Sequence, residues 1–472
     1  MAKQGCEIGL IGLGTMGRNF VLNMADHGFS VAVYNRTTDK TREFMEQEVG
    51  ARDIRGGYDL PEFVNLLRRP RAIILLVSAG PAVDAVIEEL LPFLEPGDLI
   101  IDSGNSHFTD TDRRARFLTE KRLLYLGLGI SGGESGARHG PSLMPGGPPE
   151  AYERVRRVLE AAAAQVKGEP CVTYLGSGSA GHYVKMVHNG IEYGLIQLIG
   201  ETYDLMKRGL GMEADALAPV YDQWNRGELN GYLVEITGGI FRKKDEITDK
   251  PLVDLILDEA REKGTGKWTS WDAMDLQVPT PSIDVAVVMR HLSDYKEERV
   301  AAGQVLSGPA PRFQGDRELF LAQLKNALYS GTVLTYGQGM ALLKRASQTY
   351  RYSLNLEAVA RIWRGGCIIR AALLEDIRAA FQARGDLPNL LLDRHLAREV
   401  ASRQADLRSV VCTAGELGLP APGLMASLAY YDAYRSPWLP ANLIQAQRDY
   451  FGAHTYERVD RPGVFHTNWG ED

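Results

Sequence analysis

The sequence near the N-terminus reads Glu7-Ile8-Gly9-Leu10-Ile11-Gly12-Leu13-Gly14-Thr15-Met16-Gly17, an apolar run that passes directly into a turn with three spaced glycines. A helical pattern follows over residues 18–27, Gly28 ends it, and a second apolar run spans residues 31–35. Gly-x-Gly-x-x-Gly binds a dinucleotide in this order of strand, turn, helix and strand. Outside that order, the same glycines would indicate only a flexible turn. We therefore predict a dinucleotide-binding site here.

Each glycine of the motif has its own expected role. Gly12 allows the tight turn, Gly14 lets the backbone approach a pyrophosphate, and Gly17 lets the helix pack closely on the strand. The helix N-terminus then faces the phosphates.

The end of the second predicted strand distinguishes the two nicotinamide cofactors. NAD enzymes usually carry Asp or Glu there, which accepts hydrogen bonds from the ribose hydroxyls. This chain has Asn35-Arg36-Thr37-Thr38, so no carboxylate repels a 2′-phosphate and Arg36 can pair with one. NADP is therefore the favoured cofactor. The alternative is an NAD enzyme in which Arg36 only stacks on adenine.

Further strands are predicted at residues 72–77, 99–102 and 123–128, with helical stretches between them. This alternation indicates a doubly wound parallel sheet, whose site lies at the carboxyl ends of its strands. The loops expected there are residues 78–80, 104–106 and 131–134. Ser131-Gly132-Gly133 offers backbone N–H groups and a hydroxyl suited to a carboxylate, although the same residues also make an ordinary flexible turn.

The alternation of strands stops after Gly181, and the pattern is mainly helical to about Ser436. We expect helices at residues 252–262, 283–293 and 317–340 within an all-helical second domain. Pro437 then begins an aromatic tail that is too apolar for free disorder and should dock on something. The predicted domains are residues 1–178, 179–437 and 438–472.

The stretch at residues 181–194 carries the acid–base chemistry that we expect. At the helical period, Lys185, His188, Asn189 and Glu192 share one narrow face, and the remaining faces are apolar, including Leu195, Ile196 and Leu198 just beyond the stretch. Such a helix is buried, so its charged groups lie where ionisation is costly, which favours a general base and a general acid. The alternative is a buried structural Lys–Glu network.

Composition limits the classes of partner. The 472 residues carry a net charge of −7, which argues against nucleic acid and anionic membranes as partners. The start shows no signal-peptide pattern, and no apolar run is long enough to cross a membrane. The four cysteines have no metal-ligand spacing and fit buried thiols in a reducing compartment. We therefore expect a cytoplasmic protein.

The chain resembles the family of decarboxylating 6-phosphogluconate dehydrogenases over essentially its full length. The resemblance rests on residues 9–17 with Asn35-Arg36-Thr37, and on residues 132–147, 181–194, 263–269 and 439–455. It implies NADP-dependent oxidation of 6-phosphogluconate at C3, followed by loss of CO2 to give ribulose 5-phosphate in the pentose phosphate pathway. It also implies a homodimer, sometimes a tetramer, and no metal.

The resemblance assigns roles to individual residues, with Lys185 as general base and Glu192 as general acid. The residues implied to bind substrate are Asn105, Ser131, Gly132, Gly133, His188, Asn189, Tyr193, Lys263, Arg290 and, from the partner subunit's tail, Arg448 and His454. The residues implied to bind the cofactor are Gly12, Gly14, Thr15, Met16, Gly17, Asn35, Arg36, Thr37, Val77, Ser78, Ala79 and Asn105. Taken singly, each of the basic residues is an ordinary solvated charge.

Two positions depart from the family pattern. Ser78 stands where many members have Lys, and Ser103 replaces the commoner Gly before Gly104-Asn105. Two other functions remain as rivals. One is a different β-hydroxyacid dehydrogenase, such as one that acts on hydroxyisobutyrate, and the other is a non-catalytic NADP-binding protein with the same fold.

Overall fold

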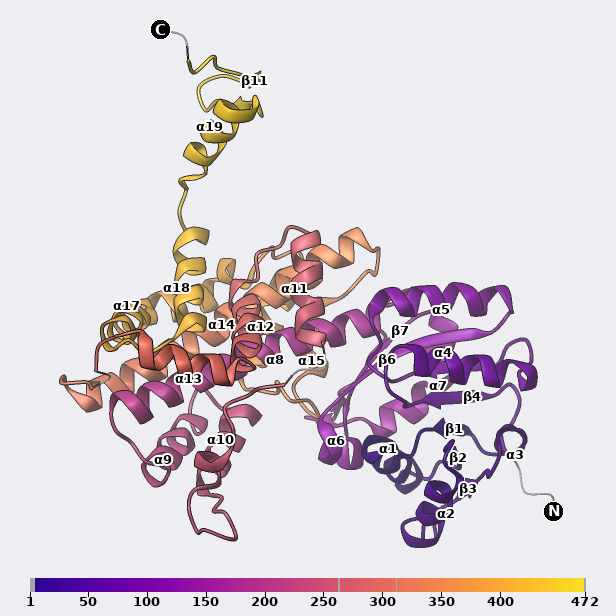
Figure 1. The fold of residues 1–472 in the computed structure, drawn as a ribbon. Helices are drawn as coiled ribbons and strands as arrows, with labels where there is room; N and C mark the ends of the chain where they lie inside the picture. Colours follow the sequence, from indigo (N-terminus) through magenta and orange to yellow (C-terminus); the bar gives the residue numbers. More distant parts are fainter. Residues whose placement is uncertain (1–4, 262–263, 311, 471–472) are drawn as a thin grey trace.

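The computed structural model describes residues 5–261, 264–310 and 312–470, which form an N-terminal α/β part, a larger helical part and a projecting tail (Figure 1). The first part contains a seven-stranded sheet in the order β3-β2-β1-β4-β5-β6-β7. The strands are β1 (Ile8–Ile11), β2 (Val31–Tyr34), β3 (Ile54–Gly56), β4 (Ala72–Leu75), β5 (Leu99–Asp102), β6 (Leu124–Ser131) and β7 (Ser142–Gly146). The helices are α1 (Thr15–Asp26), α2 (Thr38–Gln47), α3 (Leu60–Asn65), α4 (Pro81–Leu90), α5 (Phe108–Glu120), α6 (Gly133–His139) and α7 (Pro149–Ala162). The predicted doubly wound α/β fold is confirmed.

Alternate residues of the central strands belong to two separate hydrophobic cores, one on each face of the sheet. In β4, Ile74 belongs to the cluster that contains Phe20 of α1, whereas Ile73 and Leu75 belong to the cluster that contains Ile87 of α4. Strands covered on both faces are apolar throughout, which explains why they appear in the sequence as continuous runs and not as alternating patterns.

Two strands of this sheet were not foreseen in the sequence. They are the three-residue edge strand β3 and the opposite edge strand β7, which pairs antiparallel with β6 while the other pairings in this sheet are parallel. A segment of the helical part lies against the outer edge of β7. There the Ser142 N–H donates to the carbonyl oxygen of Gly366 at 2.7 Å. This contact joins the two parts of the chain near the end of β6.

The second part is helical, as predicted. A small hairpin, β8 (Gln165–Val166) and β9 (Glu169–Pro170), precedes it. Its helices are α8 (Ala180–Asp204), α9 (Ala214–Asn225), α10 (Tyr232–Arg242), α11 (Thr265–Asp275), α12 (Pro281–Ser293), α13 (Lys296–Val305), α14 (Arg317–Thr349), α15 (Leu356–Ile362), α16 (Leu373–Ala383), α17 (Arg394–Leu417) and α18 (Pro422–Tyr434).

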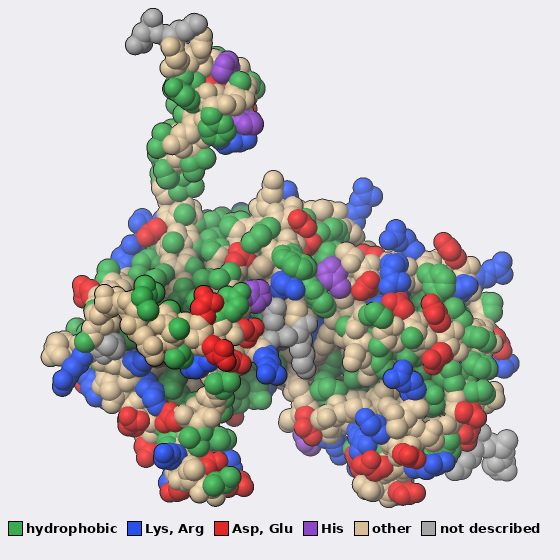
Figure 2. Space-filling model, viewed as in Figure 1, with side chains coloured by type: hydrophobic (Ala, Val, Ile, Leu, Met, Phe, Trp, Pro, Cys, Tyr) green, Lys and Arg blue, Asp and Glu red, His purple; other side chains and the backbone are tan. Residues whose placement is uncertain are grey.

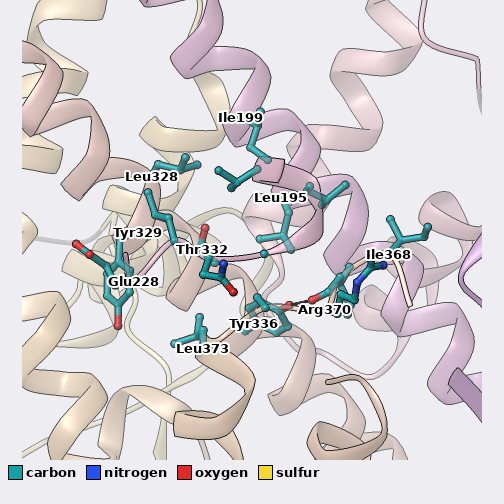
Figure 3. A pocket seen from close by; sticks show the side chains of 17 residues that line it. Leu195, Ile199, Glu228, Leu328, Tyr329, Thr332, Tyr336, Ile368, Arg370 and Leu373 are labelled. Atoms are coloured by element: carbon teal, nitrogen blue, oxygen red, sulfur yellow. Dashed lines mark hydrogen bonds between the residues drawn. The ribbon is translucent and has the colours of Figure 1, made fainter. Parts of the chain in front are cut away.

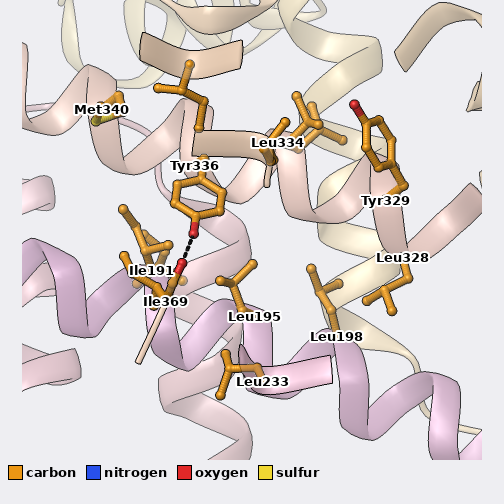
Figure 4. Close-up of a cluster of buried hydrophobic side chains, with 14 of the residues drawn as sticks. Ile191, Leu195, Leu198, Leu233, Leu328, Tyr329, Leu334, Tyr336, Met340 and Ile369 are labelled. Carbon is orange, nitrogen blue, oxygen red and sulfur yellow. Dashed lines mark hydrogen bonds between the residues drawn. The ribbon is translucent and has the colours of Figure 1, made fainter. Parts of the chain in front are cut away.

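Helix α8 connects the two parts of the molecule. It packs on β6 and β7 at one end and on α11, α12, α14 and α18 along its length. Figure 4 shows Ile191, Leu195 and Leu198 of this helix against α14, where the Tyr336 hydroxyl donates to the Ile369 carbonyl oxygen at 2.5 Å. The buried helix expected at residues 181–194 is therefore present.

Glycines on the sheet let α8 approach it closely. A Cβ at Gly129 of β6 would lie 2.5 Å from the Cβ of Lys185, and one at Gly146 of β7 would lie 2.2 Å from the Gly181 nitrogen. Since real side chains do not approach so closely, these positions are restricted to glycine, and they bring Lys185 directly onto the end of β6.

Three expectations about the helical part were wrong. The helix predicted at residues 252–262 is only a 3-10 turn (Leu252–Leu255), and extended chain follows it with Ile256 63% exposed. Its apolar residues have helical spacing, but only Val253 packs against the helical core while Leu255, Ile256 and Leu257 are exposed, and propensity alone does not sustain a helix; Glu262 itself lies outside the described residues. Ile196 is exposed on α8, and Cys412 is exposed while the other three cysteines are buried.

The tail leaves the body after α18 and stands away from it (Figure 1). It contains α19 (Ala441–Gly452) and a two-stranded hairpin, β10 (Tyr456–Glu457) and β11 (Val464–Phe465). Hydrophobic side chains lie open along this segment (Figure 2), including Trp438, Leu443 and Phe451, which is 73% exposed. None of the helices in residues 5–261, 264–310 and 312–470 combines the length and apolarity needed to cross a membrane.

Candidate active site

The glycine-rich turn after β1 leaves an open cradle at the N-terminus of α1. Gly12 has φ +111°, and a Cβ there would lie 2.4 Å from the Leu76 carbonyl oxygen, while one at Gly17 would lie 1.9 Å from the Gly12 carbonyl oxygen. Gly14, in contrast, has no atom within 4 Å of its Cβ position, and no side chain caps the helix there. The N–H groups of α1 are thus free to meet an anion.

A groove of about 380 Å³ continues from this cradle along the ends of β1, β2 and β4. Among the residues predicted to bind the cofactor, it is lined by Gly12, Gly14, Asn35, Arg36, Thr37, Val77 and Ser78. Thr15, Met16 and Gly17 form the adjoining first turn of α1, and Ala79 follows Ser78. Lys40 also lines the groove and was missed, although it stands one helical turn after Arg36. Two cations beside an uncapped cradle fit a phosphorylated dinucleotide.

Asp102, which sequence reasoning also missed, shapes the loop that carries Asn105. Its buried carboxylate accepts hydrogen bonds from the Gly104 N–H at 3.0 Å, the Ser106 hydroxyl at 2.7 Å and the Tyr125 hydroxyl at 2.8 Å, and it pairs with buried Arg114. Asn105 has φ +55°, and its Oδ1 accepts from the Ile130 N–H at 3.3 Å. The loop after β5 is therefore fixed against the end of β6.

Lys185 lies on α8 where the helix meets the sheet, with 5% of its surface exposed. Its Nζ donates to Asn189 Oδ1 at 2.6 Å. Burial lowers the pKa of Lys185, and the negative charge of Glu192 opposes that shift. The neutral amine that a general base requires is favoured here.

Glu192 lies two turns along the same face, about 10 Å along the axis for a helix with 1.5 Å rise per residue. Burial raises the pKa of Glu192, while Lys185 and Arg290 oppose the shift. The polar face of α8 formed by Lys185, His188, Asn189 and Glu192 is called the stripe below. The pKa shifts at its two ends favour the neutral forms, which are an amine at Lys185 and a carboxylic acid at Glu192. Those are the forms in which a base accepts a proton and an acid donates one.

His188 and Asn189 form a fixed network between these two groups. His188 Nδ1 lies 3.0 Å from Asn189 Oδ1, which can only accept, and the Ser131 hydroxyl lies 3.2 Å from His188 Nε2. The proton is therefore on Nδ1, and Ser131 donates to Nε2. Burial, aided by Lys185, holds the pKa of His188 well below its usual range, so its 3.9 Å approach to Glu192 is not an ion pair.

Two contacts that sequence reasoning missed hold this network in place. The Asn189 Nδ2 donates to Thr265 Oγ1 of α11 at 2.9 Å, which turns the amide oxygen toward Lys185 and His188. The Ile368 N–H lies 3.4 Å from Ser131 Oγ. Both partners are distant in the sequence. Thr265 lies within residues 263–269, on which the family resemblance partly rests, but the resemblance assigned it no role.

The remaining predicted substrate residues are placed as follows. The Arg290 guanidinium lies 3.4 Å from the centre of the Tyr193 ring, beside Glu192. Gly132 and Gly133 follow Ser131 with φ +115° and +62°, and a Cβ at Gly132 would lie 2.5 Å from the Gly366 carbonyl oxygen. Lys263 lies outside the described residues. Arg448 and His454 belong to the projecting tail, so one chain does not bring them to the stripe (Figure 1).

A small cavity also lies beside α8, but it differs from the stripe in size and chemistry. It measures about 40 Å³ and is bounded mainly by apolar side chains, including Leu195, Ile199 and Leu328 (Figure 3). Ligand pockets usually measure roughly 300–1,000 Å³. We regard this cavity as a packing void within the helical core.

Two family comparisons cover almost the whole chain. The family described as the NAD binding domain of 6-phosphogluconate dehydrogenase matches residues 7–176. The family described as 6-phosphogluconate dehydrogenase, C-terminal domain, matches residues 181–469. The chain belongs to the 6-phosphogluconate dehydrogenase family. The resemblance of the quoted motifs to this family is therefore confirmed.

The chain is also similar to individual members of the 6-phosphogluconate dehydrogenase family over nearly their full lengths. The chain is 53% identical to the NADP(+)-dependent, decarboxylating 6-phosphogluconate dehydrogenase of Bacillus subtilis, covering 99% of this chain and 100% of that protein. It is 53% identical to the decarboxylating enzyme of Synechococcus elongatus, covering 98% and 99%. A solved structure of Plasmodium falciparum 6-phosphogluconate dehydrogenase matches with a TM-score of 0.95 at 46% identity, covering 98% and 100%. That protein is described with NADP+ and with 6-phosphogluconate.

Proposed function

We propose that this protein oxidises 6-phosphogluconate with NADP and decarboxylates the product to ribulose 5-phosphate and CO2, as a cytoplasmic enzyme of the pentose phosphate pathway. The observation that supports this most directly is the buried stripe on α8. It carries a lysine and a glutamic acid on one face, next to the loops of the α/β part, and burial shifts the pKa of each toward its neutral form. Simple oxidation of an alcohol needs only the base, so the acid favours a reaction with a second proton transfer.

The first step belongs to Lys185. Its neutral amine accepts the proton of the C3 hydroxyl while C3 becomes a carbonyl. Bound NADP supplies the acceptor for the hydride that leaves C3. Asn189 Oδ1, at 2.6 Å from Nζ, orients the lone pair of the amine before the step and accepts a hydrogen bond from the ammonium after it. His188, kept neutral, adds no opposing charge as the ammonium forms.

The second step belongs to Glu192. The 3-keto acid loses its carboxylate as CO2, the electrons of the broken C–C bond form a C=C bond to C3, and the Lys185 ammonium returns its proton to the C3 oxygen, which gives an enediol. A proton must then be added to the carbon that lost CO2, and the carboxylic acid of Glu192 donates it. Seven residues separate Lys185 from Glu192, so a sugar chain lying along α8 can reach both groups, with His188 and Asn189 between them for its hydroxyls.

The other substrate contacts follow from the surroundings of the stripe. Ser131, Gly132 and Gly133 would hold the carboxylate, and Asn105 would lie between substrate and cofactor. Tyr193, Lys263 and Arg290 would surround the phosphate, with Arg448 and His454 contributed by the partner subunit's tail. The Arg290 guanidinium stacked on Tyr193 supports this end as the anionic one.

We also propose a homodimer that exchanges its tails, from which a tetramer could be built. Exposed apolar side chains on the tail, such as Leu443, Ile444 and Phe451, support an interface with another chain. The proposed domain limits are residues 1–178, 179–437 and 438–472, the last being the exchanged tail.

One assay tests the proposed function against its rivals. The purified protein is given NADP with either 6-phosphogluconate or hydroxyisobutyrate, and NADPH and CO2 are both measured. We expect NADPH and CO2 in equal amounts from 6-phosphogluconate alone. NADPH without CO2, or turnover of hydroxyisobutyrate, would assign the protein to another β-hydroxyacid dehydrogenase, and no turnover of either would indicate a binding protein.

Arg36→Glu should reverse the preference between the two cofactors. A carboxylate at this position repels the 2′-phosphate of NADP but can accept a hydrogen bond from the 2′-hydroxyl of NAD. We expect kcat/KM for NADP to fall by about a hundredfold or more, since a charge-assisted pair is replaced by repulsion, while that for NAD changes little. The measured quantity is the ratio of the two kcat/KM values. Arg42→Glu, six residues further along on α2 and paired with Asp39, is the matched control, and an unchanged ratio in Arg36→Glu would exclude phosphate recognition by Arg36.

A further inference from the structure

The tail contains a buried carboxylate although most of its residues are exposed. Asp449 of α19 has no exposed surface and accepts four hydrogen bonds. The donors are the Thr455 N–H at 2.9 Å, His466 Nδ1 at 2.9 Å, the Thr467 N–H at 3.0 Å and Trp469 Nε1 at 2.8 Å. A segment this small cannot build a large apolar core, so a saturated carboxylate is well suited to fix its fold.

One of these bonds holds an unfavourable turn. Ala453 has φ +49° and Thr455 has φ +61°, so the residues on both sides of His454 adopt the left-handed conformation. For a β-branched residue such as Thr455 this conformation is strained and persists only when its surroundings impose it. Asp449 binds the Thr455 N–H, and Gln445 Nε2 donates to the Thr455 carbonyl oxygen at 2.6 Å. The two side chains thus hold both polar groups of the strained residue.

The same helix face also carries Arg448. Gln445, Arg448 and Asp449 are spaced at i, i+3 and i+4 on α19, and Arg448 NH1 donates to Gln445 Oε1 at 3.1 Å. Gln445 therefore connects Arg448 to the turn that presents His454. We propose that Asp449 is a positioning residue, which holds the turn at residues 453–455 and so sets Arg448 and His454 for the substrate of the neighbouring subunit.

This inference rests on the proposed role of the tail, and Asp449→Asn in the full-length dimer tests it. The amide keeps the size of the side chain but cannot accept all four bonds. We expect KM for 6-phosphogluconate to rise about tenfold or more, as for loss of a charged hydrogen-bonding group, with KM for NADP unchanged. Asp460→Asn is the matched control, because Asp460 is an exposed tail carboxylate paired with Arg458, and it should change neither KM.

A second substitution separates positioning from general damage. Glycine adopts positive φ without strain, so with Thr455→Gly the turn should form without the hydrogen bond to Asp449. We expect Asp449→Asn with Thr455→Gly to regain at least about half of the lost affinity for substrate, whereas a tail that had merely unfolded would lose affinity further. Lack of recovery would overturn the role of the turn, and dissociation of the Asp449→Asn dimer would assign Asp449 to assembly instead.

Arg448→Ala, measured alongside, distinguishes the two ways of failing. If Arg448→Ala raises KM for 6-phosphogluconate and Asp449→Asn does not, Asp449 is not a positioning residue while the role of the tail stands. If Arg448→Ala leaves KM unchanged, the proposed role of the tail fails, and the inference fails with it.

Discussion

Lys185→Met should stop NADPH formation from 6-phosphogluconate while the folded protein still binds NADP. Methionine fills the volume of the lysine side chain between Gly129 and the helix core but cannot accept a proton. General-base catalysis contributes roughly 10²–10⁴-fold, so kcat should fall by at least that factor. The measurements are kcat by NADPH absorbance and the Kd for NADP by titration. A variant that retains wild-type kcat would remove Lys185 from the role of base.

Lys185→Arg is the informative control for this result. Arginine keeps the positive charge and cannot lose its proton at neutral pH. If Lys185 acts as a base, Lys185→Arg should be as inactive as Lys185→Met. If the lysine only attracts the anionic substrate, Lys185→Arg should retain most of the activity.

The wild-type pH profile follows from the same groups. In the proposed mechanism only the deprotonated amine of Lys185 is active, and burial lowers its pKa, so kcat/KM should rise with pH and reach its plateau below the ordinary range of lysine. In the same mechanism Glu192 must be protonated, and burial raises its pKa, so the loss of activity caused by its ionisation should lie above the ordinary range of glutamic acid. His188 contributes neither limb because its pKa lies well below its ordinary value.

The parts of this structure that depend on local sequence could be predicted from the sequence. The glycines at 12, 14 and 17 fix a turn by their own backbone requirements, and the stripe from Lys185 to Glu192 follows from the period of a helix. The failed helix at residues 252–262 shows the limit of this reasoning. Helical spacing is only a local preference, and most apolar side chains of this segment, Leu255, Ile256 and Leu257, find no surface to pack on.

The parts that depend on distant contacts could not be predicted. Gly129 is an ordinary strand residue until α8 packs against it, and the Asp102 carboxylate finds two of its partners in other elements, Tyr125 of β6 and Arg114 of α5. Thr265 and Ile368 fix the orientation of Asn189 and Ser131 across 76 and 237 residues of sequence. Such pairings are set by tertiary packing, for which one sequence carries no periodic signal.

Mixed dimers should show whether the tail of one chain completes the substrate site of its neighbour. Arg448→Ala removes the proposed phosphate contact and should raise KM for 6-phosphogluconate strongly. In a dimer that pairs Lys185→Met on one chain with Arg448→Ala on the other, tail exchange leaves one complete site. That site combines the intact Lys185 of one chain with the intact Arg448 of its neighbour, so the mixed dimer should show about half of wild-type activity.

A second mixed dimer serves as the matched control. It pairs Lys185→Met with Glu192→Gln, two changes within the same chain's stripe, so each of its sites carries one defect whether or not tails are exchanged. It should remain inactive, which excludes recovery by simple refolding. If the tail instead folded back onto its own chain, both sites in the Lys185→Met and Arg448→Ala dimer would also stay damaged. Persistent inactivity, with mixed dimers confirmed by differently tagged chains, would therefore refute the exchanged tail, whereas recovery in this pair alone would establish that each stripe on α8 depends on the neighbouring chain.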